Sequence, residues 1–160
     1  MLHRLCDGLA GLIRNVVWIA FAGMIATVGL QIVARNLLDA QIIWTSDVAL
    51  LLFTWLIFVG SALGLRTGSH YFVDMLPTHI PWVRLPVEII SIVSGFCVVW
   101  ILSVDGWMLA SLRASGEVQS IGISRFWMYL PLPVSGVLMA VFLIEMIVNL
   151  VRNPFGKVPA

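Results

Sequence analysis

Four long stretches without a charged residue dominate the 160-residue sequence. Each is 16 to 20 residues long, and they cover residues 15–34, 48–65, 89–104 and 126–144. An α-helix rises about 1.5 Å per residue, so a helix that crosses a hydrocarbon layer about 30 Å thick needs roughly 17–25 residues. Three of the stretches have that length as they stand. The remaining one, residues 89–104, reaches it if its helix continues past Asp105 toward Leu112.

The composition indicates that these stretches lie in lipid. Hydrophobic residues make up 61% of the chain and charged residues 11%, whereas a soluble domain carries roughly 25% charged residues. So few charges cannot cover the surface of a soluble protein, and lipid or a lipid-embedded partner must surround it. Backbone groups inside a membrane have to bond to one another, and the stretches lack the alternation of barrel strands, so each is expected to be a helix. The net charge of +1, without runs of Lys or Arg, excludes nucleic acid as a partner.

We therefore predict an all-α integral membrane protein in which residues 1–160 form a single membrane domain. Its four transmembrane helices are expected at about residues 15–34, 48–65, 86–112 and 127–151. Pro86 and Glu88 suggest the start of the third helix, because proline suits the first turn and an acid suits the positive end of the helix dipole. Pro131 and Pro133 fit a helix near its start but not in its interior, so the regular part of the fourth helix is expected from about Pro131.

Two further helices are predicted outside the spans. Apolar side chains recur every three or four residues before the first span, as in an amphipathic helix, at Leu2, Leu5, Leu9, Leu12 and Val16. That helix can lie on the membrane surface or bind a partner helix, and both readings stay open. Residues 67–84 combine aromatic side chains with Pro77 and Pro81, which is typical of a short interfacial helix anchored at the headgroups.

Positive charges are unevenly divided between the two sides of the predicted membrane domain. The N-terminal segment, the second connection and the C-terminal tail carry six Lys and Arg residues, and the other two connections carry three. Both termini are therefore expected in the cytoplasm. We also expect the first span to be retained rather than cleaved as a signal peptide, because its uncharged stretch exceeds the usual apolar core of about 7–15 residues.

Side chains suited to catalysis or cofactor binding are scarce within the spans. The histidines His3, His70 and His79 lie outside them, so a haem held between two membrane helices is not expected. Cys6 and Cys97 are too far apart along the predicted fold for a disulfide or a zinc site. The chain also lacks a Gly-rich phosphate loop and a nucleophile motif. We predict no catalytic, cofactor-binding or metal-binding residue and no enzymatic activity.

The polar residues of the spans are placed mainly at their ends. Asp47, Glu88, Asp105 and Glu145 all fall near span ends, which favours interface placement and helix-end electrostatics. An ion relay or pairing with a partner protein are the alternatives. Gln31 lies well inside the first span, where an interhelical hydrogen bond is expected.

Small residues spaced four apart predict close helix packing. The clearest case is the GxxxG motif of Gly60 and Gly64 in the second span. Similar pairs are Gly23 with Thr27, Ser91 with Gly95, and Gly136 with Ala140. Some of this packing is expected within the four spans and some against a partner.

The second span and the residues after it carry the most specific pattern. Its elements are Trp44-Thr45-Ser46-Asp47, Phe53-Thr54-Trp55, Phe58-Val59-Gly60-Ser61-Ala62, Arg66 and His70-Tyr71-Phe72-Val73-Asp74. Their order and spacing resemble the small membrane subunit, Q type, of tripartite ATP-independent periplasmic (TRAP) transporters. The segment from Gly122 to Pro133 also resembles that family's entry into its fourth span, so the resemblance covers about residues 10–150.

The resemblance implies both a function and partners. The chain would be the four-helix companion of a much larger permease subunit, in a 1:1 complex in the bacterial inner membrane. A periplasmic binding protein would deliver an organic acid, and a sodium gradient would drive its uptake through ion and substrate sites in the larger subunit. The small subunit would be a non-catalytic scaffold for the static part of an elevator-type carrier.

Seven residues of this region are expected to contact the partner or to pack the helices, namely Trp44, Asp47, Trp55, Gly60, Gly64, Arg66 and His70. The residues alone leave two other functions open. A self-sufficient homo-oligomeric carrier or pore would need a charged residue in the middle of a span. A membrane enzyme or electron carrier would need histidines or nucleophiles at that depth.

Overall fold

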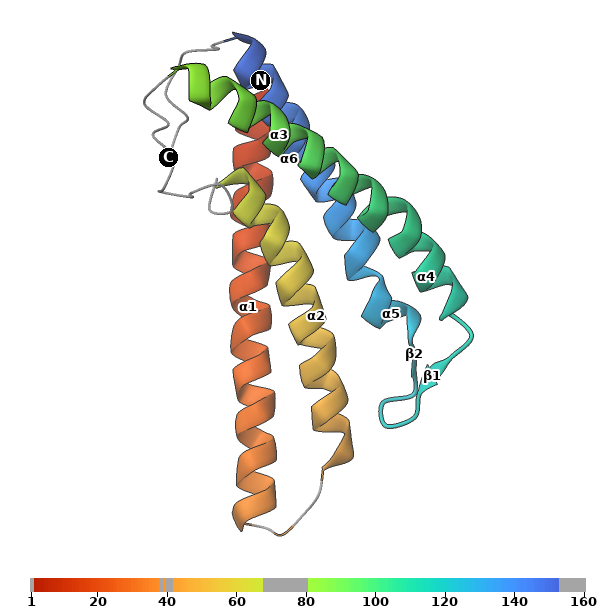
Figure 1. The fold of residues 1–160 in the computed structure, drawn as a ribbon. Coiled ribbons are helices and arrows are strands. Elements are labelled where there is room, and N and C mark those ends of the chain that lie inside the picture. The colour runs from red at the N-terminus through yellow and green to blue at the C-terminus, as the bar shows by residue number, and fades with distance from the viewer. Residues whose placement is uncertain (1, 38, 40–41, 68–80, 153–160) are drawn as a thin grey trace.

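The computed structural model describes residues 2–37, 39, 42–67 and 81–152, and these form an all-α structure with one small hairpin (Figure 1). The long helices are α1 (Leu2–Leu37), α2 (Ile43–Arg66), α3 (Pro81–Trp100) and α6 (Pro131–Arg152). The helix of α3 continues through a π-helical turn, η1 (Ile101–Asp105), into α4 (Gly106–Leu112). A two-stranded antiparallel hairpin and a short helix connect α4 to α6, namely β1 (Glu117–Val118), β2 (Ile123–Ser124) and α5 (Phe126–Tyr129).

Four helices of the described chain are long and apolar enough to cross a membrane. The candidate spans are Cys6–Leu37, Ile43–Arg66, Ile92–Leu112 and Phe126–Val148. The predicted all-α fold with four long apolar helices, each a candidate membrane span, is therefore confirmed. Since the chain reverses direction between successive spans, the start of α1 and the end of α6 lie at the same end of the structure (Figure 1).

The helices pack as neighbours in the order α1, α2, α6 and α3. The α2 helix lies between α1 and α6, and α6 packs in turn against α3 and η1 (Figure 1). The last span is the most enclosed of the four: 44% of its most apolar stretch is buried, against 11% for the second and third spans and 0% for the first. The outer helices consequently expose long apolar faces that suit lipid or another membrane protein.

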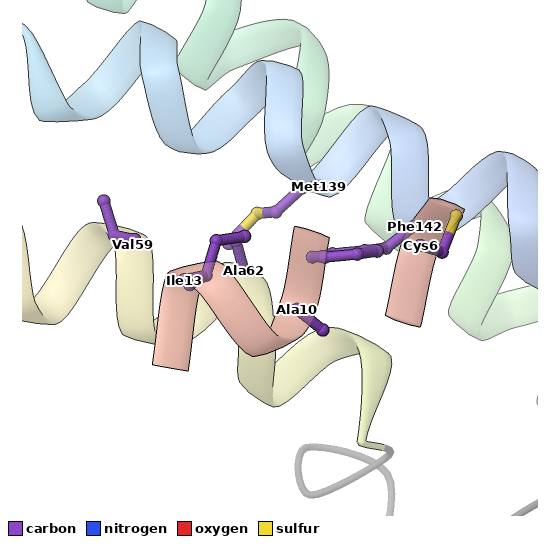
Figure 2. Close-up of a cluster of buried hydrophobic side chains, with 7 residues drawn as sticks. All are labelled: Cys6, Ala10, Ile13, Val59, Ala62, Met139 and Phe142. Atoms are coloured by element: carbon purple, nitrogen blue, oxygen red, sulfur yellow. The ribbon is translucent and has the colours of Figure 1, made fainter. Parts of the chain in front are cut away.

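Figure 2 shows the core of the chain, which lies where α1, α2 and α6 meet, near the start of α1. Its buried side chains are Cys6, Ala10 and Ile13 from α1, Val59 and Ala62 from α2, and Met139 and Phe142 from α6. Small side chains on α1 and α2 leave room for the Met139 and Phe142 side chains of α6. Because lipid tails are as apolar as its ring, the burial of Phe142 stabilises the chain through close van der Waals packing and not through removal from water.

The N-terminal segment differs from the prediction. It is not a separate amphipathic helix, because α1 continues unbroken from Leu2 to Leu37. The buried face of this segment is also shifted from the predicted stripe: Leu12 and Val16 are 63% and 50% exposed, whereas Ala10 and Ile13 are buried. The spacing of apolar residues did not fix which face is buried, because that face depends on where α2 and α6 pack against α1.

The segments that connect the spans agree with the prediction before the last span and differ from it before the third. The regular helix of the last span begins at Pro131, after the separate short helix α5, which confirms the expectation drawn from the two prolines. The helix that leads into the third span begins earlier than predicted, at Pro81 rather than near Pro86. The predicted interfacial helix falls mainly on residues 68–80, which lie outside the described residues.

Glycines bring α6 unusually close to the third span. A Cβ atom on Gly136 would lie 2.5 Å from Ser103 Oγ and 2.9 Å from the Ser103 backbone nitrogen. A Cβ atom on Gly106 would lie 2.9 Å from Leu132 Cβ. The two helices can approach this closely only because both positions are glycine. The predicted packing role of Gly136 is thus confirmed.

Candidate functional site

The predicted contact residues of the second span do not converge on one site but are distributed along α2. Trp44 lies in the first turn of α2 and Arg66 in its last, which are roughly 33 Å apart at about 1.5 Å per residue. His70 lies outside the described residues. This arrangement is typical of a helix that connects its neighbours and unlike the convergent geometry of a catalytic or ligand-binding site.

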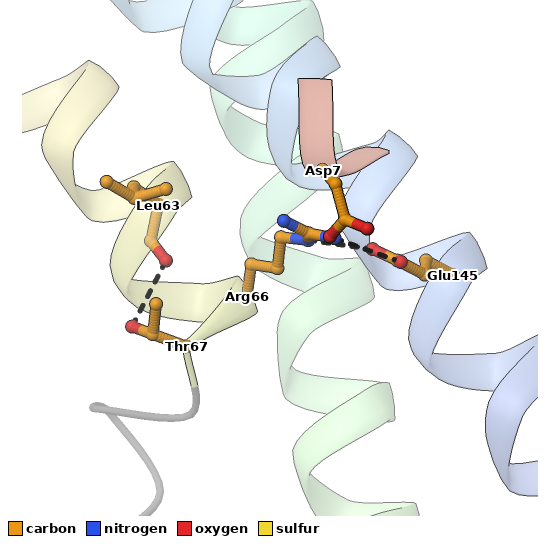
Figure 3. A network of polar contacts seen from close by, with 5 residues as sticks. All are labelled: Asp7, Leu63, Arg66, Thr67 and Glu145. Atoms are coloured by element: carbon orange, nitrogen blue, oxygen red, sulfur yellow. Dashed lines mark hydrogen bonds and ion pairs between the residues drawn. The ribbon is translucent and has the colours of Figure 1, made fainter. Parts of the chain in front are cut away.

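Arg66 is the centre of an ion network that joins three helices (Figure 3). Its Nε donates to Glu145 Oε2 at 2.9 Å and its Nη2 to Glu145 Oε1 at 3.2 Å, so the guanidinium and the carboxylate pair in a two-pronged geometry. Its Nη2 also donates to Asp7 Oδ1 at 2.6 Å. Because Arg66 is on α2, Glu145 on α6 and Asp7 on α1, this network joins the three helices near the start of α1.

The network combines a buried and an exposed partner. The side chain of Glu145 is 7% exposed, that of Arg66 is 18% exposed, and that of Asp7 is 53% exposed. The Arg66 guanidinium also lies 5.5 Å from the centre of the Phe142 ring, within the range of a cation–π contact. A carboxylate as buried as Glu145 requires a paired cation, so Arg66 is needed to hold Glu145 in the core.

Trp55 links the middle of α2 to the short helix before the last span. Its indole Nε1 donates a hydrogen bond to the backbone carbonyl of Trp127 at 3.2 Å. The Trp127 carbonyl belongs to α5, a single helical turn in which some backbone carbonyls have no hydrogen-bond donor within the helix. Trp55 also packs against the core, so it serves as an internal contact of this chain.

The first turns of α2 make two further polar contacts. Ser120 Oγ, in the hairpin between β1 and β2, donates a hydrogen bond to Asp47 Oδ2. Gln31 Nε2 on α1 donates to Ser46 Oγ at 3.1 Å. The interhelical hydrogen bond predicted for Gln31 is therefore confirmed. Asp47 fixes the hairpin beside α2, a role that was not expected for it.

Gly60, the first glycine of the GxxxG motif in α2, makes no close contact with another helix of the described chain. A Cβ atom on Gly60 would meet no atom within 4 Å, so this face of α2 is not covered by the rest of the described chain. Trp44 is likewise 44% exposed. These two positions face lipid or another protein.

The described residues offer no metal site and only open pockets. Among them, no group of three or more His, Cys, Asp or Glu side chains is placed to hold a metal ion. The better-defined hollow, about 520 Å³, is open to the surface between the start of α2 and the hairpin, and its lining includes Asp47, Arg125 and Tyr129.

Sequence reasoning missed several of these contacts. It did not pair Arg66 with Glu145 and Asp7, although a cation and two acids at the same end of three spans were a signal for pairing. It also missed the contact of Ser120 with Asp47 and the close approach at Gly106. Those two contacts depend on how the hairpin folds back and on the π-helical turn, and no residue pattern predicts either feature.

Comparison with known proteins identifies the family. Residues 24–153 match the family model described as tripartite ATP-independent periplasmic transporters, DctQ component. The chain is 34% identical over 140 residues to the sialic acid TRAP transporter small permease protein SiaQ of Vibrio cholerae, which covers 84% of this chain and 79% of that protein. It is 27% identical over 131 residues to the sialic acid TRAP transporter permease protein SiaT of Haemophilus influenzae. That match covers 76% of this chain but only 20% of the larger permease.

These matches agree with the fold and with the absence of a convergent site in the part of the chain described. The family is one of transporter components and not of enzymes. The tripartite system to which it contributes also includes a partner permease and a periplasmic binding protein. This chain belongs to the DctQ family, the small permease subunits of TRAP transporters.

Proposed function

We propose that this chain is a non-catalytic scaffold, which binds a much larger permease subunit in a 1:1 complex and holds it in the membrane. The transported solute is an organic acid that a periplasmic binding protein delivers, and a sodium gradient drives its uptake. The solute and ion sites lie in the larger subunit. Sialic acid, for which both similar proteins are named, is one acid of this class.

The observation that carries this proposal is the way the chain uses its polar groups. Arg66, Trp55 and Gln31 each join one helix of the chain to another. Such contacts make the small subunit rigid, and a rigid body suits a scaffold better than a carrier that must change shape.

The match to SiaT supports the same proposal. A segment similar to this chain occupies about a fifth of that single permease chain. The remaining four fifths of that protein must therefore work beside the similar segment. A separate small subunit is expected to occupy the same place next to a separate large one.

We further propose that the whole chain, residues 1–160, forms one membrane domain of the bacterial inner membrane with both termini in the cytoplasm. The excess of Lys and Arg on one side supports this orientation. The common position of the start of α1 and the end of α6 is consistent with it (Figure 1). Fusions of alkaline phosphatase and of a fluorescent protein to each end test it: both ends should support fluorescence and neither should show phosphatase activity.

The central experiment is purification followed by transport. The tagged small subunit, co-expressed with the large permease subunit, should purify in mild detergent as a 1:1 complex. Proteoliposomes should take up the solute only with both subunits, the binding protein and an inward sodium gradient. A homo-oligomer of the small subunit that transports by itself would overturn the proposal in favour of a self-sufficient carrier or pore.

A further inference from the structure

One carboxylate within a candidate membrane span is left on the outside of this chain. Asp105 is the last residue of η1 and lies inside the span Ile92–Leu112. It is exposed, and within the described residues no hydrogen bond or ion pair holds its carboxylate. This sets Asp105 apart from Asp47 and Glu145, whose carboxylates are bonded within the chain.

The packing of the third span against α6 fixes Asp105 in this outward position. Ser103 lies against Gly136, and Gly106 lies against Leu132, at distances that leave no room for a Cβ atom on either glycine. Residues on both sides of Asp105 are thus locked onto α6. The helix cannot rotate to bring Asp105 inward without breaking this close packing, since packed helices do not deform continuously.

Asp105 also cannot reach water by bending toward the nearer end of its helix. Leu112, where α4 ends, is seven residues away, or roughly 10 Å at about 1.5 Å per residue. Side chains of a helix lean toward its N-terminus, which for Asp105 is the direction away from that end. An aspartate is moreover too short to extend along the helix as Lys and Arg do.

The surroundings of Asp105 on this outer face are apolar. Ile101, Val104 and Met108 are 55%, 47% and 63% exposed. An ionised carboxylate that faces lipid at such a position is costly to insert into the membrane. Charged groups in membrane spans therefore almost always have a partner, and here the partner must come from outside the described chain.

We propose that Asp105 and the apolar residues around it, Ile101, Val104 and Met108, form a contact surface for the large permease subunit, and that a Lys or Arg side chain on a membrane helix of that subunit pairs with the Asp105 carboxylate. This inference rests on the proposed function, namely that the chain assembles with the larger permease. The charge of Asp105 specifies the chemistry of the partner, and the match to a permease five times the length of the shared segment specifies its source.

The experiment is co-purification through an affinity tag on the large subunit. Asp105→Lys should lower recovery of the small subunit at least tenfold, because two cations then face each other. Asp105→Asn should lower recovery less than Asp105→Lys does, and Asp105→Glu should keep most of the recovery seen with the unmodified chain. Glu117→Lys is the matched control, since Glu117 is an exposed acid of the hairpin outside the apolar helix, and it should leave recovery unchanged.

The outcomes separate this inference from the proposed function. If the unmodified chain fails to co-purify with the large subunit, the proposed function is wrong. If it co-purifies and Asp105→Lys does so equally well, only the contact surface is wrong. If the chain alone forms a homo-oligomer that Asp105→Lys dissociates, the partner is a second copy and the inference is overturned.

A crosslinking measurement keeps the test independent of folding defects in the variants. Cys97 is exposed and lies eight residues, about two helical turns, before Asp105, whereas Cys6 is buried. A photo-crosslinker attached to Cys97 should therefore capture the large subunit. In a Cys97→Ser background, the same reagent on Trp18→Cys of α1 serves as the comparison, because Trp18 is 65% exposed on another helix. Capture from position 18 and not from Cys97 would assign the contact to α1 and refute the proposal.

Discussion

The ion network around Arg66 predicts that removing one buried charge lowers the stability of the chain, whereas removing both charges of the pair does not. Arg66→Met should destabilise the chain strongly, because it leaves the Glu145 carboxylate, 7% exposed, without a cation. Adding Glu145→Met to that variant should recover most of the loss. The double variant removes both charges and fills the site with apolar side chains of similar length, a replacement that is often neutral or stabilising.

The magnitudes follow from the burial of each partner. Breaking a buried pair by removing one member costs about 3–5 kcal/mol, which applies to Arg66→Met. Glu145→Gln keeps an acceptor for Arg66, and Arg66 keeps Asp7, so its cost should be about 1–3 kcal/mol. Asp7→Asn alters a pair whose acid is 53% exposed, and it should cost about 0.2–1 kcal/mol.

The free energy of unfolding can be measured in mixed micelles by titration with a denaturing detergent, followed by the fluorescence of the seven tryptophans. Arg14→Met is the control, since Arg14 is an exposed arginine of α1 and its removal should change the free energy by less than about 0.5 kcal/mol. The reasoning fails if Arg66→Met is no more destabilising than Arg14→Met. It also fails if the double variant is as unstable as the sum of the single ones, because the two residues would then act independently.

Three further predictions concern the helix contacts and use the same unfolding measurement. Gly136→Ala should destabilise the chain by about 1–3 kcal/mol, because its Cβ would meet Ser103 at 2.5 Å. Gly60→Ala is the control and should be close to neutral, since no atom lies within 4 Å of that position. Equal effects of the two variants would contradict the assigned packing. Trp55→Phe removes the hydrogen bond to the Trp127 carbonyl and should cost about 0.5–1.5 kcal/mol beyond any change in packing, with Trp44→Phe as a control at an exposed indole. Gln31→Leu should cost only about 0.6 kcal/mol, the average for interhelical hydrogen bonds in membranes, and a loss above 2 kcal/mol would mean that Gln31 does more than bond Ser46.

The sequence predicted those features that depend on local patterns. Four spans follow from the spacing of charges, because the thickness of the bilayer sets the length of an uncharged helix. The start of the last helix at Pro131 follows from the missing proline N–H, and the interhelical bond of Gln31 follows from the cost of an unbonded amide in lipid.

Features that depend on which helices are neighbours could not be predicted in the same way. Arg66 and Glu145 are 79 residues apart, and their pairing requires that α2 packs against α6. The buried face of α1 is set by where α2 and α6 pack against it, so the hydrophobic pattern selected Leu12 where the structure buries Ile13. Gly60 shows the same limit, since a small residue signals close packing but not the partner.

Two kinds of contact hold the helices together: polar bonds join α1, α2 and α6, and close glycine contacts join the third span to α6. The α1, α2 and α6 helices are joined by the bonds of Arg66, which bring charges together inside the chain. The third span is held to α6 at Gly106 and Gly136, where backbones touch and no ionised side chain takes part. A helix fixed by glycines on one face is free to carry a charge on the other, and Asp105 occupies that other face. If the large subunit binds there, it meets a surface whose orientation is already set before assembly, so little ordering cost opposes binding.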